Sequence, residues 1–166
     1  MLSGNLQVIA NFKKVKTNDL TSPDSKLNYM VDHVFTNGAG ANKAENLFSD
    51  KRPLALGANE ELDLNGVLND DFGAALTFTK VKGLLVRNLG TVANIKVGGA
   101  ALNGFASMFG DATDILIIPP GGMIVLVAPN AAGYGVTDTT GDLLKVENMD
   151  GANPVDYDII IIGETS

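Results

Sequence analysis

The chain has 166 residues, no cysteine, no tryptophan, one histidine and a formal net charge of −7 at pH 7. The absence of cysteine excludes disulfide frameworks, zinc–thiolate sites, iron–sulfur clusters and cysteine nucleophiles. A single histidine excludes sites that need two imidazoles, and the acidic charge argues against nucleic-acid binding, which requires a cationic surface. The length predicts one domain with a core of its own.

The first 26 residues predict a strand followed by a polar arm. Residues 7–12 form a short apolar run of β type, and residues 13–25 are polar and end at a Ser-Pro-Asp turn. The polar segment opens with three lysines, Lys13, Lys14 and Lys16. We therefore predict an N-terminal strand and arm over residues 1–26 and a single domain over residues 27–166.

The remaining segments predict short strands. Residues 27–35 alternate with a period of two, which indicates a strand, and residues 77–88 form the longest strand candidate. Residues 115–118 and 123–127 flank a Pro-Pro-Gly-Gly sequence. Because proline fixes φ and glycine accepts positive φ, we predict a hairpin-like reversal there between two buried strands. Further strands are predicted at residues 60–64, 94–97, 134–137, 143–146 and 155–162.

These segments make about nine or ten short strands, with turn signals roughly every 8–12 residues. This spacing predicts an all-β fold, an antiparallel β-sandwich or jelly roll with an extended N-terminal arm. The 19 glycines and the charged fraction of 19% fit a turn-rich β protein whose surface is partly covered by neighbours. No stretch keeps a 3.6-residue period, so an α/β fold is the weaker alternative.

Charge is distributed unevenly along the chain. In residues 101–166, Lys145 is the only base beside nine acidic residues, whereas residues 1–100 are nearly neutral. A solvated acidic surface is the favoured interpretation. Head-to-tail docking of one copy on another is the alternative.

No motif predicts catalysis or a cofactor. Adjacent strand residues such as Glu60 and Glu61 point to opposite faces, so they cannot converge on one substrate. His33 lies in an alternating apolar strand, where a packed or interfacial histidine is favoured over a catalytic base. The glycine-rich stretches match no phosphate-binding pattern. The Asp-rich segments 111–114 and 138–142 lack the spacing of a calcium loop, although a weak calcium site stays open as an alternative.

Two groups of residues are candidates for binding a partner. The first comprises Phe12, Lys13, Lys14 and Lys16, and the second comprises Phe105, Met108 and Phe109. The basic arm could dock on an acidic neighbour, or it could be a solvated segment. The second group lies in a predicted loop or short helix over residues 100–110, where core packing is favoured over an exposed partner patch.

The start of the chain lacks the basic and apolar regions of a secretory signal, and its longest apolar runs are far below the ~20 residues of a membrane span. We therefore expect synthesis in the cytoplasm and no membrane partner.

Several stretches between Tyr29 and Gly163 carry a resemblance to a known family. They are Thr36–Ala44, Leu47–Arg52, Leu62–Leu68, Asp71–Gly73, Thr77–Leu84, Gly141–Val146 and Tyr157–Gly163. In this span, roughly four-fifths of the sequence, the chain resembles small β-rich structural proteins of tailed-bacteriophage virions, found with head and neck components. These motifs are patterns of strand and turn and carry no catalytic residues.

The resemblance implies a non-enzymatic virion protein, a decoration or cement protein on the capsid exterior of a phage assembled in a bacterial host. Its partners would be the major capsid protein and further copies of itself in a homotrimer, because capsid lattices offer three-fold positions. The alternative is a module on the head or tail that anchors a fibre or binds host glycan. That alternative is weaker because glycan sites use aromatic faces, and the chain has no tryptophan and three tyrosines.

Overall fold

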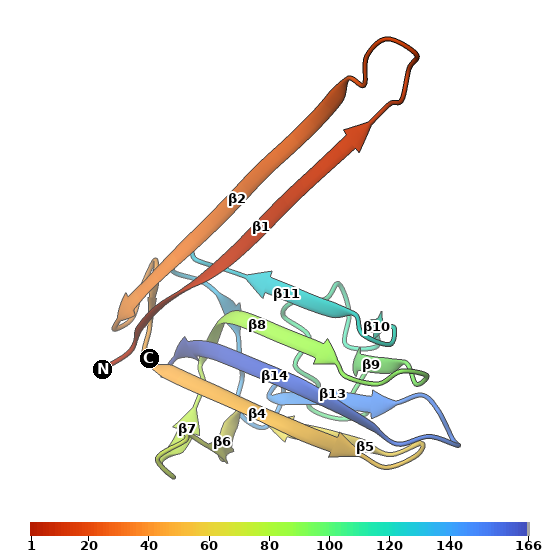
Figure 1. The fold of residues 1–166 in the computed structure, drawn as a ribbon. Coiled ribbons are helices and arrows are strands. Elements are labelled where there is room, and N and C mark those ends of the chain that lie inside the picture. Colours follow the sequence, from red (N-terminus) through yellow and green to blue (C-terminus); the bar gives the residue numbers. More distant parts are fainter. Residues whose placement is uncertain (166) are drawn as a thin grey trace.

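The computed structural model describes residues 1–165, which fold into fourteen strands without a helix (Figure 1). Two regions are distinct: the arm, residues 1–37, is one long hairpin, and the body, residues 38–165, holds the other strands. The all-β prediction is confirmed. There are more strands than the predicted nine or ten. Four were not predicted: β3 (Lys43–Ala44) and β7 (Ala75–Thr77), which are very short, and β4 (Asn46–Leu54) and β6 (Asn65–Asn69).

The strands are β1 (Ser3–Val15), β2 (Asp24–Asn37), β3 (Lys43–Ala44), β4 (Asn46–Leu54), β5 (Asn59–Asp63), β6 (Asn65–Asn69), β7 (Ala75–Thr77), β8 (Lys80–Asn88), β9 (Ile95–Gly98), β10 (Ile115–Ile118), β11 (Met123–Val127), β12 (Tyr134–Gly135), β13 (Leu143–Asn148) and β14 (Val155–Glu164).

Two larger antiparallel sheets form most of the body and share one core. In addition, β6 pairs with β7 in a small separate sheet, and β3 pairs parallel with β2 of the arm. The β8 sheet has the order β11-β8-β14-β4, with β12 beside β8, and the β9 sheet has the order β10-β9-β13-β5. Every second residue of β14 is buried from Val155 to Ile161, and Leu144 and Val146 of β13 alternate in the same way. One hydrophobic cluster contains buried side chains of both sheets, so the architecture is β-sandwich-like.

The Pro-Pro-Gly-Gly turn reverses the chain as predicted, but it does not close a hairpin. Gly122 N–H donates to Pro119 C=O at 2.9 Å, which forms the turn. β10 then pairs with β9, whereas β11 pairs with β8 in the other sheet. The flanking strands are also not fully buried: Ile115 and Ile117 are 41% and 53% exposed. The reason is that β10 and β11 are the end strands of two different sheets.

The arm is a hairpin along its whole length. β1 and β2 pair antiparallel from Ser3–Thr36 at the root to Val15–Asp24 near the tip. Residues 13–15, predicted as part of a polar arm, are therefore strand, and the predicted boundary between residues 26 and 27 falls inside β2. Figure 1 shows this hairpin standing away from the body, with only its root beside the sheets.

Candidate interaction surface

The register of the arm sorts its side chains onto two faces. Directly paired residues of an antiparallel hairpin share a face, and successive residues alternate between faces. One face is apolar over most of its length, with a single histidine in it. We call it the arm stripe: Leu6, Val8, Ala10 and Phe12 of β1, with Leu27, Tyr29, Val31, His33 and Phe35 of β2.

The opposite face of the arm is mixed in character. Asn5 Nδ2 donates to Asp32 Oδ1 at 2.7 Å on this face. Its apolar side chains, Ile9, Val15, Met30 and Val34, are each more than half exposed and are interleaved with polar residues. Only the arm stripe therefore forms a continuous apolar surface.

Exposure is lowest at the root of the arm stripe and highest near its tip, with Ala10 and Val31 intermediate. Phe35 is 2% exposed, Val8 is 45% exposed and Phe12 is 69% exposed. Leu27 and Tyr29, further along the stripe than Val8, are also more than half exposed. A ribbon of two strands cannot bury either of its faces by itself, so the outer half of the stripe stays in contact with solvent.

The root of the arm stripe rests on Gly83 of β8. A Cβ atom at this position would lie 2.5 Å from Leu6 Cδ1 and 2.8 Å from Ile162 Cγ1, closer than real Cβ contacts allow. Gly83 itself is buried. The missing side chain at Gly83 therefore forms the seat on which Leu6 packs.

A buried polar cluster ties the inner end of the arm to the body. Lys82 and Glu164 are both fully buried and form an ion pair at 2.9 Å. Glu164 Oε1 accepts the N–H of Gly40 at 2.8 Å, and Lys82 Nζ donates to the C=O of Gly40 at 3.1 Å and to that of Asn130. Since residue 40 lies in the turn between β2 and β3, the cluster fixes this turn to β8 and β14.

The polar cluster also lowers the pKa of Glu164. Burial by itself opposes ionisation and would raise the pKa, but hydrogen bonds from Lys80, Lys82 and the Gly40 N–H outweigh it and hold the pKa of Glu164 below its ordinary value. The carboxylate is therefore charged and fully partnered at neutral pH, as a buried charge requires.

The outer face of the β8 sheet, opposite the core, presents three rows of side chains across its strands. The first row is Val127, Gly83, Ile162 and Leu47; the second row is Val125, Leu85, Ile160 and Ser49; the third row is Met123, Arg87, Asp158 and Lys51.

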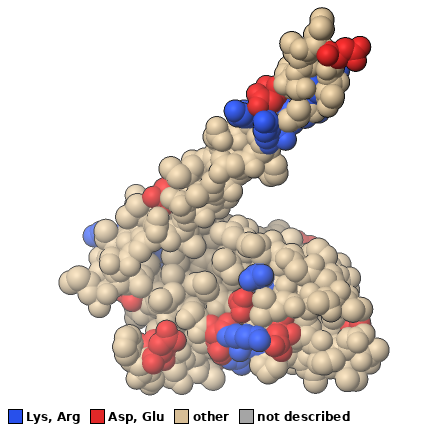
Figure 2. Space-filling view, in the orientation of Figure 1, with Lys and Arg blue, Asp and Glu red and all other residues tan. Residues whose placement is uncertain are grey.

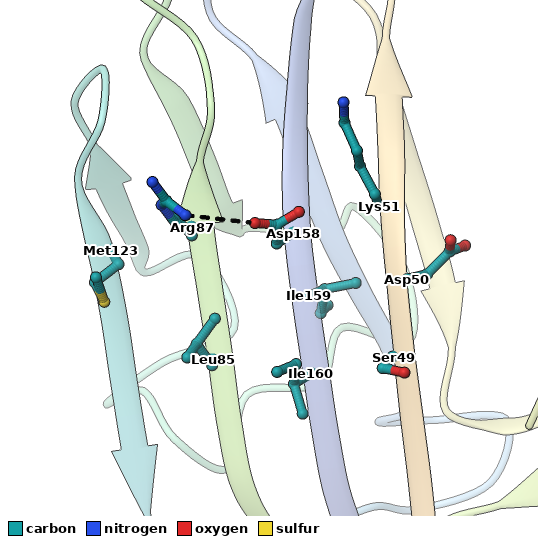
Figure 3. A pocket seen from close by; sticks show the side chains of 9 residues that line it. All are labelled: Ser49, Asp50, Lys51, Leu85, Arg87, Met123, Asp158, Ile159 and Ile160. Carbon is teal, nitrogen blue, oxygen red and sulfur yellow. Dashed lines mark ion pairs between the residues drawn. The ribbon is translucent and has the colours of Figure 1, made fainter. Parts of the chain in front are cut away.

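The three rows differ in what covers them. The arm root lies on the first row, where Leu6 packs over Gly83. The second row is apolar except for Ser49 and is partly exposed. Figure 3 shows the third row beside it, with Arg87 facing Asp158 across 4.0 Å. A shallow hollow of about 660 Å³ lies over the second and third rows.

The predicted basic arm residues lie at the free end of the hairpin. Lys13, Lys14 and Lys16 are all exposed, and Lys13 pairs with Asp24 of the opposite strand at 3.0 Å. Figure 2 shows most charged side chains of the arm gathered toward this end, with few along the shaft. Phe12, the fourth predicted residue of this group, lies on the arm stripe.

The second predicted group belongs to the body. Phe105 is 3% exposed and lies in the core, and Met108 packs against the core, which confirms the favoured interpretation for these two residues. The ring of Phe109 lies so close to Gly98 that a Cβ there would be 2.7 Å from Phe109 Cζ. The structure thus places this group away from the arm stripe and engages it in packing.

The titratable residues considered as catalytic candidates have structural contacts. Glu60 accepts a hydrogen bond from the Tyr157 hydroxyl at 2.6 Å and pairs with Arg52 at 2.6 Å, which links β5 to β14 and β4. Burial and the hydrogen bond to Glu60 raise the pKa of Tyr157 far above its ordinary value. Glu61 on the same strand is exposed, as the alternation predicts. His33 is partly buried in the arm stripe opposite Leu6.

Among residues 1–165, no group of three or more histidine, cysteine, aspartate or glutamate residues is arranged to hold a metal ion. In the two Asp-rich segments, Asp111 Oδ1 accepts the N–H of Thr113 at 2.9 Å and Asp142 Oδ2 accepts the N–H of Thr139 at 2.7 Å. The weak calcium site stays a prediction. The described part of the chain also holds no helix long and apolar enough to cross a membrane.

Sequence reasoning did not identify two parts of this surface, the arm stripe and the second row. The stripe had a signal: apolar residues at every second position from Leu6 to Phe12 and again, with His33 as the exception, from Leu27 to Phe35, on either side of a segment that contains Pro23. Such matched alternation predicts a hairpin with one apolar face. The second row had no signal of its own, because strands distant in sequence build it.

A comparison with protein-family models found no match, and neither curated proteins nor solved structures showed a significant similarity to the chain. The resemblance to phage virion proteins therefore stays a prediction.

Proposed function

We propose that this chain is a non-enzymatic structural protein of a tailed-phage virion, a decoration or cement protein on the capsid exterior. Its partners are the major capsid protein and further copies of itself, as a homotrimer. The observation that carries the proposal is the arm, a strand hairpin that stands away from the body with apolar side chains such as Phe12 69% exposed. Exposed apolar surface of this extent is typical of a protein that functions in contact with other chains.

The resemblance of residues 29–163 to virion proteins supports the same role. A capsid protein of this kind needs a rigid body and a projecting element that reaches a neighbour, and the arm and the sandwich are suited to those two tasks. The glycan-binding alternative is weaker because few tyrosine rings are available to contact a sugar. Tyr157 is fully buried and Tyr134 packs against the core, so Tyr29 alone is largely exposed.

The test is to add the purified protein to phage heads assembled without it. We expect saturable binding at the three-fold positions of the lattice and a higher temperature of head disruption. Binding at a single vertex would instead favour the fibre-anchoring alternative. No binding to heads, together with saturable binding to a glycan array, would overturn the proposal.

A second test uses a variant with a shortened arm, in which an Asn-Gly turn replaces residues 13–26. This change joins Phe12 to Leu27, which are directly paired, and a two-residue loop suits such a hairpin. If the basic tip contributes to attachment, this variant binds heads more weakly while the body keeps its unfolding midpoint.

A further inference from the structure

We infer that the arm stripe of one copy packs on the second row of the outer face of the β8 sheet in another copy, so that the protein assembles by exchange of arms. The inference stands on the arm and the sheet alone and holds whatever particle the protein serves. A second copy of this chain would cover the second row, which the single chain leaves partly exposed.

The outer half of the arm has an apolar face that the rest of the same chain leaves exposed. The outer part of the arm stripe presents Val8, Phe12, Leu27 and Tyr29, each between 45% and 69% exposed. These side chains lie on one face because of the hairpin register, so they form a continuous patch. A two-stranded ribbon is only marginally stable in water unless one face is covered. The arm therefore requires a covering surface over its outer half.

The β8 sheet supplies a surface that already binds this stripe. At the root, Leu6 packs over Gly83 and against Ile162 in the first row. A pocket between the arm root and this sheet is lined by Leu6, Phe35 and Ile160 among others, so the second row begins where the intrachain contact ends. At the root, an apolar strand face packs on an apolar sheet face. Packing of the same kind on the second row requires another stretch of arm stripe.

The chain's own arm cannot provide that segment. The hairpin leaves the body beyond its root, as Figure 1 shows, and Val8, one rung beyond Leu6 on the stripe, is already 45% exposed. Covering the second row with the same arm would require the hairpin to fold back over its seat. A second copy brings an identical stripe without this bend. In a homotrimer each arm would lie on the sheet of the next copy, so that the exchange closes into a ring.

Charge favours the same partner. The arm tip between residues 13 and 26 carries four lysines and two aspartates, whereas residues 38–166 carry eight basic and 16 acidic side chains. The tip and the body therefore carry opposite net charges, and in the third row Asp158 lies between Arg87 and Lys51. Opposite potentials of this kind steer association and orient the partners.

Cross-linking tests the contact directly, because the chain has no cysteine of its own. One single-cysteine variant, Ala10→Cys, marks the middle of the arm stripe, and a second, Ser49→Cys, marks the second row. The two proteins carry tags of different size and are mixed with a short bis-maleimide. Asn11→Cys, on the opposite face of the arm one residue away, replaces Ala10→Cys in the matched control.

We expect the mixed cross-link between Ala10→Cys and Ser49→Cys to form in several-fold higher yield than that between Asn11→Cys and Ser49→Cys. Equal yields from the two arm positions, or no mixed product at concentrations where the protein sediments as an oligomer, would overturn the inference. Phage heads take no part in the experiment, so its failure is separate from failure of the proposed function.

Sedimentation provides a second test. Phe12→Asp places a charge in the arm stripe, and Ile9→Asp places one at a comparably exposed apolar site on the opposite face. We expect Phe12→Asp to weaken self-association by roughly 30-fold or more, the size of an interface hot spot. Ile9→Asp should leave self-association nearly unchanged. A wild-type protein that is monomeric at all concentrations, or equal effects of the two variants, would contradict arm exchange.

Discussion

The arm and the body use the same strand alternation but differ in what it buries. In β14 of the body, every second side chain from Val155 to Ile161 enters a core closed by the opposite sheet. In the arm, β1 and β2 alternate as regularly, yet no second layer covers them beyond the root, and Phe12 is 69% exposed. The comparison teaches that period two specifies a strand and its two faces, whereas burial depends on whether another layer is present.

The two regions meet at the polar cluster beneath the arm root. Removing one charge there should have the largest effect on the whole molecule. Lys82→Met removes the fully buried partner of Glu164, which keeps Lys80 and the Gly40 N–H. It also leaves the carbonyls of Gly40 and Asn130 without this donor. We expect these losses together to lower the free energy of unfolding by about 3–5 kcal/mol, measured by urea denaturation. The double variant Lys82→Met/Glu164→Gln should recover part of this loss. Equal stability of wild type and Lys82→Met would show that the cluster does not hold the regions together.

A pair of truncations measures the difference in burial between the regions. Ile159→Ala removes a fully buried side chain from the body, and we expect it to lower the free energy of unfolding by about 2–5 kcal/mol. Phe12→Ala removes a larger side chain from the exposed arm and should change this free energy of the monomer by less than about 0.5 kcal/mol. Denaturation at dilute concentration gives both values. A large effect of Phe12→Ala there would mean that the arm is buried within a single chain.

Gly83→Ala tests the seat on which the arm rests. The new Cβ overlaps Leu6 and Ile162, so the arm root must shift. We expect a loss of about 1–3 kcal/mol, typical of overpacking, with faster amide exchange in β1 near Leu6. The control Gly135→Ala has open space at its Cβ and should be far milder. If exchange in β1 is unchanged in Gly83→Ala, the root does not depend on this seat.

Acid should loosen the same junction by a smaller amount. Because the pKa of Glu164 in the folded protein is below its ordinary value of 4.5, its contribution to stability is present above that pH and is lost as the pH falls through the lowered pKa. We expect Glu164→Gln to be less stable than wild type at neutral pH and to lose less stability on acidification. Urea denaturation between neutral pH and pH 3 measures this difference. Parallel pH profiles for the two proteins would contradict it.

The smallest effect is expected at the arm tip. Replacing residues 13–26 with an Asn-Gly turn removes strand that makes no contact with the core, so the unfolding midpoint of the body should not change. Differential scanning calorimetry at dilute concentration measures it. A clear drop in the midpoint would show that the arm stabilises the body along its whole length.

Features set by residues close together in the sequence could be predicted, whereas pairings between distant strands could not. The alternation at residues 27–35 and the turn residues around Pro119 are local features, and both led to correct local predictions of strand and reversal. The pairing of β10 and β11 with different partners was not predictable in this way. Each partner is chosen by which sheet offers a free edge in the folded body.

In the candidate surface, too, some residues could be identified from the sequence and others only from the folded structure. Lys13, Lys14 and Lys16 could be identified as an exposed basic group because lysines in a polar segment are rarely buried. The role of Phe105 in the core agreed with its hydrophobicity. Gly83 as a seat for Leu6 could not be found, because a buried glycine is recognised only when the side chain that approaches it is known.

By itself, the sequence determined that this protein is a turn-rich β protein with a basic segment near its start and an acidic C-terminal third, because periodicity, turn chemistry and charge are properties of neighbouring residues. Only the tertiary structure decided that the first two strands form a free arm, that Lys82 and Glu164 meet beneath it, and that an apolar row stays open on the β8 sheet. Those features arise from contacts between residues far apart in the chain, and they depend on which strands pair and which faces a second layer covers.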